Sequence, residues 1–349
     1  MPSRRPRQAP AAPASTSIPT TPTPPTPAPA AQLSISDSTF RDGQQAREPY
    51  TVDQIVTLFG LLHRLGGPRG VIRRSEFLLF SRKDRQAAEQ CLSLGLPFPR
   101  VCAWIRARQD DLDLVRDLGI QEVAVATPLS DSHFRYVRRG TRAEVVEEYL
   151  RIVDQALEWG LTPTCHLEDV TRADFTGVVL PFVQQLVGRA NEAGRPILVR
   201  LVDTAGVGLP WPEAAAPRGL PAMVAALRRE AGLPAAGLEV HNHNDGGLVI
   251  ANSVAAWLYG AGANVGTLLG IGERSANPPI ERLLFWRLAL LGDTHGVDFN
   301  VISEIEAFYL RELQSLVPPH RLMGDEPLNL SPVSLTALYA AAERLREPT

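Results

Sequence analysis

Short apolar runs alternate with amphipathic stretches along the chain from residue 33 onward. The apolar runs have the length of buried strands, which in a parallel sheet carry apolar side chains on both faces. These runs are Ile35–Phe40, Arg74–Phe80, Arg100–Ile105, Glu122–Thr127, Thr162–Glu168, Ile197–Thr204, Leu238–His243 and Ala263–Leu269. The stretches between them have the period of helices with one apolar face. Examples are Val52–Leu65, Arg82–Leu94, Arg142–Trp159 and Ile250–Gly260.

Eight such alternations over about 250 residues predict an α/β fold, the (β/α)₈ TIM barrel. The alternative is a doubly wound open sheet, which would gather its site at one crevice. Polar residues instead follow several predicted strands, as in Arg41-Asp42-Gly43, His166–Asp169 and Asp203–Gly206. A barrel collects its site from the C-terminal ends of many strands, so this distribution favours the barrel.

Two flanking segments lack the alternation. Residues 1–32 are mostly Pro, Ala, Thr and Ser, and bury too little apolar surface to offset their ordering entropy, which predicts a disordered N-terminal tail. The barrel is expected over residues 33–292. Residues 293–349 are expected to form a short helical C-terminal appendage, with helices at Val301–Leu316 and Leu335–Leu345.

The composition excludes several classes of protein. A chain of 349 residues with 44% hydrophobic side chains has ample material for a large core. A formal net charge of −3 gives no reason to expect a nucleic-acid partner. No apolar run approaches the ~20 residues of a membrane span. The widely spaced Cys91, Cys102 and Cys165 form neither a zinc-type pair nor a disulfide framework, which indicates a reducing, cytoplasmic location.

Two histidines give the strongest chemical signal. His241 and His243 stand two residues apart on a predicted strand, so their imidazoles share one face. Asp42, after the first strand, is the natural carboxylate partner, and Asn277 in the loop Gly270–Asn277 adds an amide oxygen. This set predicts a catalytic divalent metal, namely Mn²⁺, Co²⁺, Mg²⁺ or Zn²⁺. The alternative is that each residue makes only a local hydrogen bond at a strand end.

Charged neighbours of these ligands suggest further roles. Arg41 is either a fixed cation near a developing enolate or a salt-bridge residue at the barrel rim. It reaches the site only if the first strand has ended there. Glu168 and Glu76 are candidate acid/base groups or partners of a histidine. His133, on the loop after the fourth strand, is either an acid/base residue or a solvated loop histidine.

Three other residues are candidates for binding substrate. Thr204 can donate to a substrate carboxylate or act as a turn hydroxyl. Arg74 and Arg106 lie on predicted barrel strands, where an arginine needs an anion or a carboxylate partner. Either they pair with Glu76 or Glu168, or one of them binds the anionic end of the substrate.

Three motifs resemble those of a known family. Asp37–Gln45 resembles the opening signature of the metal-dependent Claisen-condensing acyltransferases, which include isopropylmalate, homocitrate, citramalate and Re-type citrate synthases. His241–Asp245, with Gly247-Leu248 and Ala251–Ser253, is similar to their second signature. Gly270–Asn277 is similar to the Gly-Ile-Gly-Glu-Arg loop that follows. The resemblance covers about residues 33–325.

The resemblance implies a TIM-barrel enzyme that condenses acetyl-CoA with a 2-oxo acid, and a homodimer. It implies that Asp42, His241 and His243 bind the metal, with Asn277 close by or ligating. Arg41 would stabilise an enolate. Glu168, Thr204 and Gln45, the last residue of the first signature, would contact substrate.

Comparison of the family's branches favours a synthase. The lyase branch uses a cysteine after the eighth strand, and residues 270–279 contain none. The carboxyltransferase branch uses a barrel lysine, and Lys83 is expected on an outer helix. The segments Gln44–Arg47, Leu65–Pro68 and Val71–Arg73 look most like Re-citrate synthase and the phosphinomethylmalate and phosphonomethylmalate synthases of antibiotic pathways.

An acidic 2-oxo acid is therefore the expected substrate, either oxaloacetate or a phosphinate or phosphonate analogue such as phosphinopyruvate. Pro318–Gly324 resembles the family's post-barrel linker, but the usual catalytic-histidine motif does not follow it, which leaves the general base open. The alternatives are an isopropylmalate, homocitrate or citramalate synthase, and a non-catalytic member that binds ligand.

Overall fold

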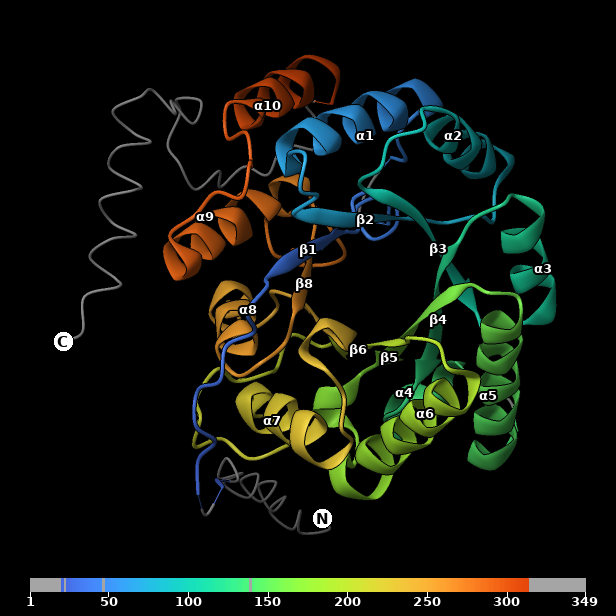
Figure 1. The fold of residues 1–349 in the computed structure, drawn as a ribbon, viewed down its shortest axis with the longest axis vertical. Helices are drawn as coiled ribbons and strands as arrows, with labels where there is room; N and C mark the ends of the chain where they lie inside the picture. Colours follow the sequence, from blue (N-terminus) through green and yellow to red (C-terminus); the bar gives the residue numbers. More distant parts are fainter. Residues whose placement is uncertain (1–19, 22, 46–47, 138–139, 314–349) are drawn as a thin grey trace, which may run out of the picture.

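Eight parallel strands close into a barrel in the order β1-β2-β3-β4-β5-β6-β7-β8 (Figure 1). The computed structural model describes residues 20–313, apart from 22, 46–47 and 138–139. The strands are β1 Ser34–Asp37, β2 Ile72–Phe77, β3 Arg100–Arg106, β4 Glu122–Pro128, β5 Thr162–Glu168, β6 Leu198–Asp203, β7 Leu238–Asn242 and β8 Ala263–Gly266. The predicted TIM barrel is confirmed, and the open sheet is excluded.

Helices form a ring around the strands (Figure 1). They are α1 Val52–Gly66, α2 Arg82–Ser93, α3 Gln109–Asp117, α4 Asp131–Val137, α5 Arg142–Glu158, α6 Leu180–Ala193, α7 Leu220–Glu230, α8 Val249–Leu258, α9 Ile280–Leu291 and α10 Val301–Glu312. Local sequence fixes several helix starts. Thr51 and Thr141 each form a capping box with the residue three positions later, which satisfies two of the free N–H groups of α1 and α5.

The two faces of each strand have different surroundings. On β5, Cys165 and Leu167 join the apolar core between the strands and the helices. His166 lies between them in sequence, so it points to the opposite face, into the barrel. Arg200 on β6 and Glu239 on β7 are buried in the same way and stand outside the apolar core. The interior of this barrel is therefore strongly polar, whereas most barrels fill it with branched apolar side chains.

The structure describes part of each flanking segment. Residues 20–32 contact the barrel, because Thr20 bridges Ala214 and the Ala28 N–H donates to Leu258 O at 2.9 Å. These described residues of the predicted tail therefore lie against the barrel, whereas residues 1–19 and 22 lie outside the described residues, and the division into tail, barrel and appendage stays a prediction. Of the predicted appendage, the structure describes α10, which packs on α1. The helix predicted at Leu335–Leu345 lies outside the described residues.

Two expectations from composition can be compared with the described chain. Cys91, Cys102 and Cys165 are all buried, and none of them forms a disulfide. Within residues that the structure describes, no helix combines the length and apolar character required to cross a membrane.

Candidate active site and metal centre

Three side chains from distant parts of the sequence meet in the barrel. Asp42, His241 and His243 are buried, and one ligand atom from each lies within 4.8 Å of the others. β1 ends at Asp37, and the chain then turns back so that the Asp42 N–H donates to Ser38 O at 2.8 Å. This turn places the Asp42 carboxylate 3.4 Å from His241 Nε2. The two histidine rings lie 4.9 Å apart, nearly perpendicular.

The polar atoms of this cluster fit a divalent metal ion. Among the described residues, His241 Nδ1, His243 Nδ1 and Asn277 Oδ1 are buried without a hydrogen-bond partner. The amide of Asn277 donates from Nδ2 to Asp42 Oδ2 at 2.5 Å, which leaves its oxygen available. Nitrogen and oxygen donors of this kind match the borderline and hard divalent ions. The structure thus brings together all four residues that the sequence predicted as ligands.

The charge states suit metal binding. Burial lowers the pKa of His241 to about 4, so its imidazole is neutral and has a free lone pair at neutral pH. Burial alone would raise the pKa of Asp42, but the Arg41 guanidinium and the two histidines outweigh it and hold that pKa well below its usual range. Asp42 is therefore an ionised carboxylate.

In the loop after β8, the backbone of Gly272 lies very close to the side chain of Asn277. A Cβ on Gly272 would lie 1.8 Å from Asn277 Nδ2, so only glycine fits while the amide faces Asp42. The Asn277 N–H donates to Gly270 O at 3.0 Å and closes the loop. The glycines of this motif thus serve to position Asn277.

Arg41 lies beside the cluster because β1 has ended before it. Its Nη1 contacts Asp42 Oδ1 at 3.1 Å, and its Nε donates to Glu76 Oε2 at 3.2 Å. The guanidinium also lies over the Trp104 ring, 5.6 Å from the centroid. Arg41 is thus ion-paired and lies next to the candidate metal ligands, and its role near a developing enolate stays a prediction.

Glu168, at the end of β5, lies between two imidazoles. His133 Nε2 is 3.8 Å from Glu168 Oε2, and His166 Nε2 is 3.9 Å from Glu168 Oε1. His133 belongs to the short helix α4, so its expected placement on a loop was wrong. Thr204 Oγ1 accepts the Asp169 N–H at 2.8 Å and keeps its own hydrogen for donation. The catalytic and substrate-binding roles of these residues stay predictions.

The remaining predicted residues lie apart from the cluster. Arg74 is buried and forms ion pairs with Glu122 at 2.9 Å and Glu239 at 2.8 Å, near the N-terminal ends of the strands. Arg106 is half exposed and pairs with Asp111 at 2.7 Å. Both arginines thus have carboxylate partners, although not the glutamates that the sequence suggested. Gln45 is exposed on the turn after Asp42.

A network of buried charged side chains, on the N-terminal side of the metal-ligand cluster along the barrel, was not predicted from the sequence. Arg200 bonds to Glu76, and its Nη2 donates to Glu239 at 2.8 Å. His166 accepts from Arg200, and burial together with this cation lowers its pKa well below the usual range. The alternation of inward and outward side chains along a strand could have revealed them, because each of these residues occupies an inward position of a strand that was correctly predicted.

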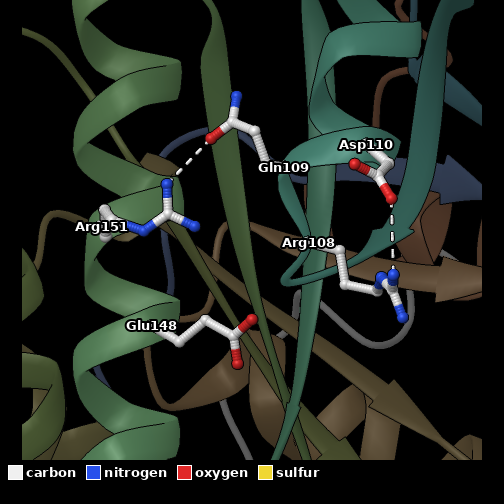
Figure 2. Close-up of a pocket in the computed structure, with 5 residues that line it drawn as sticks. All are labelled: Arg108, Gln109, Asp110, Glu148 and Arg151. Carbon is white, nitrogen blue, oxygen red and sulfur yellow. Dashed lines mark hydrogen bonds and ion pairs between the residues drawn. The ribbon is translucent and has the colours of Figure 1, made fainter.

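A surface hollow of about 460 Å³ lies outside the barrel, between α3 and α5 (Figure 2). Two pairs of its side chains contact each other. Arg151 donates to Gln109 at 2.9 Å, and Arg108 lies 3.4 Å from Asp110. This hollow is separate from the buried metal-ligand cluster.

The parallel strands form a closed barrel, and candidate Asp, His and Asn ligands lie at their C-terminal ends. These features define the class of this protein as a TIM-barrel protein with a candidate divalent-metal site. The chain belongs to the HMGL-like family, which residues 32–308 match. This confirms the family resemblance seen in the sequence.

The chain is also similar to several named synthases. The chain is 44% identical to a citrate (Re)-synthase of Syntrophus aciditrophicus over 83% of its length and 43% identical to that of Clostridium kluyveri over 82%. It is 35% identical to the 2-phosphinomethylmalate synthase of Streptomyces hygroscopicus over 74%. The chain spans 46%, 63% and 60% of the lengths of these three relatives, respectively.

Solved structures confirm the fold. The hydroxymethylglutaryl-CoA lyase of Pseudomonas aeruginosa superposes with a TM-score of 0.66 at 19% identity, covering 83% of this chain and 96% of the lyase. The carboxyl transferase domain of Rhizobium etli pyruvate carboxylase with pyruvate and biocytin gives 0.57 at 18% identity, covering 82% and 48%.

Proposed function

We propose that this chain is a metal-dependent acyltransferase that condenses acetyl-CoA with an acidic 2-oxo acid. Oxaloacetate is the favoured substrate, and a phosphinate or phosphonate analogue of it is the alternative substrate. The main support is the buried cluster of Asp42, His241, His243 and Asn277 in a chain 43–44% identical to two citrate (Re)-synthases. Mn²⁺ is the favoured metal among Mn²⁺, Co²⁺, Mg²⁺ and Zn²⁺.

The proposed reaction forms one carbon–carbon bond and releases CoA. A base takes a proton from the methyl carbon of the thioester, and that carbon adds to the keto carbon of the acid. The keto oxygen becomes a hydroxyl by taking a proton, and water cleaves the thioester to give a carboxylic acid and CoA. A divalent ion held by the cluster would polarise the keto group and fix its orientation.

The chain's own residues supply the remaining chemistry. Arg41, held by Glu76 and Asp42, places a fixed positive charge where an enolate oxygen develops, without reorganisation during the reaction. Glu168, with His133 at 3.8 Å, is the proposed acid/base pair that receives the methyl proton. Thr204 and Arg106, at the C-terminal ends of β6 and β3, are the proposed contacts to the substrate's anionic groups.

Release of free CoA tests this function. Purified protein is incubated with acetyl-CoA, Mn²⁺ and a panel of 2-oxo acids, and the thiol is followed. We expect metal-dependent release with oxaloacetate or its phosphorus analogues. Preference for 2-oxoisovalerate, 2-oxoglutarate or pyruvate would instead select an isopropylmalate, homocitrate or citramalate synthase. Binding of metal and acid without thiol release from any of them would overturn the proposal in favour of a ligand-binding protein.

A further inference from the structure

His166 forms part of the site wall without an assigned role. It lies on β5 two residues before Glu168 and points into the barrel, and it is only 2% exposed. Its ring packs edge-on to Trp104 at 5.9 Å and lies 6.1 Å from the ring of His241. The imidazole therefore borders the metal-ligand cluster directly.

The hydrogen bond from Arg200 determines the tautomer of His166. Arg200 Nη1 lies 3.2 Å from His166 Nδ1. A guanidinium can only donate, so Nδ1 accepts and carries no hydrogen. A neutral imidazole then has its hydrogen on Nε2.

Arg200 is held in place by two carboxylates. Its Nε and Nη2 donate to Glu239 Oε2 at 2.9 and 2.8 Å, and its Nη1 also donates to Glu76. Arg200 is completely buried. The guanidinium therefore cannot turn away from His166 without giving up its ion pairs with two buried carboxylates.

The Nε2–H of His166 has no hydrogen-bond partner among the described residues. Glu168 Oε1 lies 3.9 Å from this nitrogen, which is beyond hydrogen-bonding distance. This N–H lies beside Glu168 and the metal-ligand cluster, where an oxygen of a bound molecule can accept its hydrogen.

We infer that Arg200 is a positioning residue that fixes His166 as an Nε2–H donor, and that this donor binds an oxygen of the anionic side chain of the 2-oxo acid. This inference rests on the proposed function and adds a source of substrate selectivity to it. An alkyl 2-oxo acid has no oxygen there and leaves the donor unpaired, so it is rejected relative to an acidic one.

Nitrogen NMR of the histidine side chains tests the tautomer without turnover. Comparison with a His166→Gln spectrum assigns the His166 signals. We expect an unprotonated Nδ1 and a protonated Nε2, with the Nε2–H signal shifting when oxaloacetate is added to the Mg²⁺-loaded protein. In Arg200→Lys, which cannot make all three contacts, we expect a mixture of tautomers. A protonated Nδ1 in the unmodified protein overturns the inference.

Calorimetric binding of 2-oxo acids to the Mg²⁺-loaded protein, without acetyl-CoA, tests the selectivity. For His166→Phe we expect roughly ten- to hundredfold weaker binding of oxaloacetate, with 2-oxoisovalerate changed less than about threefold. Gln places its amide nitrogen near the position of Nε2 and is expected to restore most of the binding. His166→Asn, whose amide nitrogen reaches only the position of Nδ1, is not.

Leu167→Met, on the outer face of β5, is the matched control and is expected to bind both acids normally. Equal losses for both acids in His166→Phe, no loss for either, or an unmodified protein that binds neither acid contradicts the inference. Selective binding through His166 without CoA release would overturn the proposed function and leave the inference standing.

Discussion

Single polar atoms of the metal-ligand cluster are left unsatisfied by the rest of the described chain. His241 Nδ1, His243 Nδ1 and Asn277 Oδ1 are buried without hydrogen-bond partners. Each such atom costs about 1–3 kcal/mol of stability relative to a paired one. A bound divalent ion would recover part of this cost, because it would bring one or more of these donors into coordination. Binding of a metal ion by these residues should therefore also stabilise the folded protein.

Replacing His243 by alanine removes one predicted ligand. We expect Mn²⁺ affinity, measured by calorimetry, to fall more than roughly 100-fold. Loss of a residue that only hydrogen-bonds to a metal ligand costs up to about 100-fold, and loss of a ligand itself should cost more. The circular dichroism spectrum should not change, because removal of the imidazole leaves the strands intact. His295→Ala, on a surface loop, is the control and should bind normally. Unaltered Mn²⁺ affinity in His243→Ala would remove this residue from the site.

Gly272→Ala tests the positioning of Asn277. The new Cβ would lie 1.8 Å from Asn277 Nδ2, so the amide must move away from Asp42. We expect at least about tenfold weaker Mn²⁺ binding, as for loss of a partner that orients a ligand. Gly188→Ala on α6 has open space around its Cβ and should leave binding normal while stabilising the helix by about 1 kcal/mol. Equal metal affinity in both variants would contradict this role of Gly272.

At the scale of elements, apolar patterning predicted the strands well and their ends less well. β5 has the predicted bounds, Thr162–Glu168. β1 was expected to reach Phe40 but ends at Asp37, where the Asp37 carboxylate accepts the Thr39 N–H at 3.0 Å. Such a turn depends on side-chain hydrogen bonds, which hydrophobic periodicity does not report.

Glu281, at the start of α9, gives the fold a pH dependence. Its buried carboxylate accepts the Leu269 N–H at 3.0 Å, and burial raises its pKa from 4.5 to about 7. The unfolded chain ionises at lower pH, so this group's contribution to stability is full below about pH 4.5 and is lost as pH rises through about 7. The loss amounts to about 3 kcal/mol at most.

Urea unfolding of the wild type and Glu281→Gln between pH 5 and 8 measures this effect, in the range set by the two pKa values. Glutamine keeps an acceptor for Leu269 and cannot ionise. We therefore expect the variant's stability to fall less with rising pH than that of the wild type. Parallel pH profiles would show that Glu281 does not titrate in this range.

Across the whole molecule, charges of alternating sign run through the barrel interior from the metal-ligand cluster to the N-terminal ends of the strands. In order, this charge column consists of Asp42, Arg41, Glu76, Arg200, Glu239, Arg74, Glu122 and Arg100. Each buried ion alone would cost several kcal/mol, and alternation gives every charge an opposite neighbour.

Only part of this site could be predicted from the sequence. The metal ligands carry a local signature, two histidines on one strand and an aspartate at a strand end. The charge column does not, because its pairs join positions as far apart as Glu76 and Arg200, whose contact depends on closure of the barrel. For the same reason, Arg74 was first assigned to substrate without knowledge of its partners across the barrel.

Arg74→Met tests whether this arginine serves the column or the substrate. Arg74 is buried between Glu122 and Glu239, so its loss leaves carboxylates short of a partner and should destabilise the protein by about 3 kcal/mol or more. Arg100→Met breaks a pair with the same Glu122, but Arg100 is 59% exposed, so its loss should cost about 1 kcal/mol or less. Urea unfolding measures both. At temperatures where Arg74→Met is folded, its affinity for oxaloacetate should equal that of Arg100→Met. A selective loss of oxaloacetate binding in Arg74→Met would return Arg74 to the substrate site.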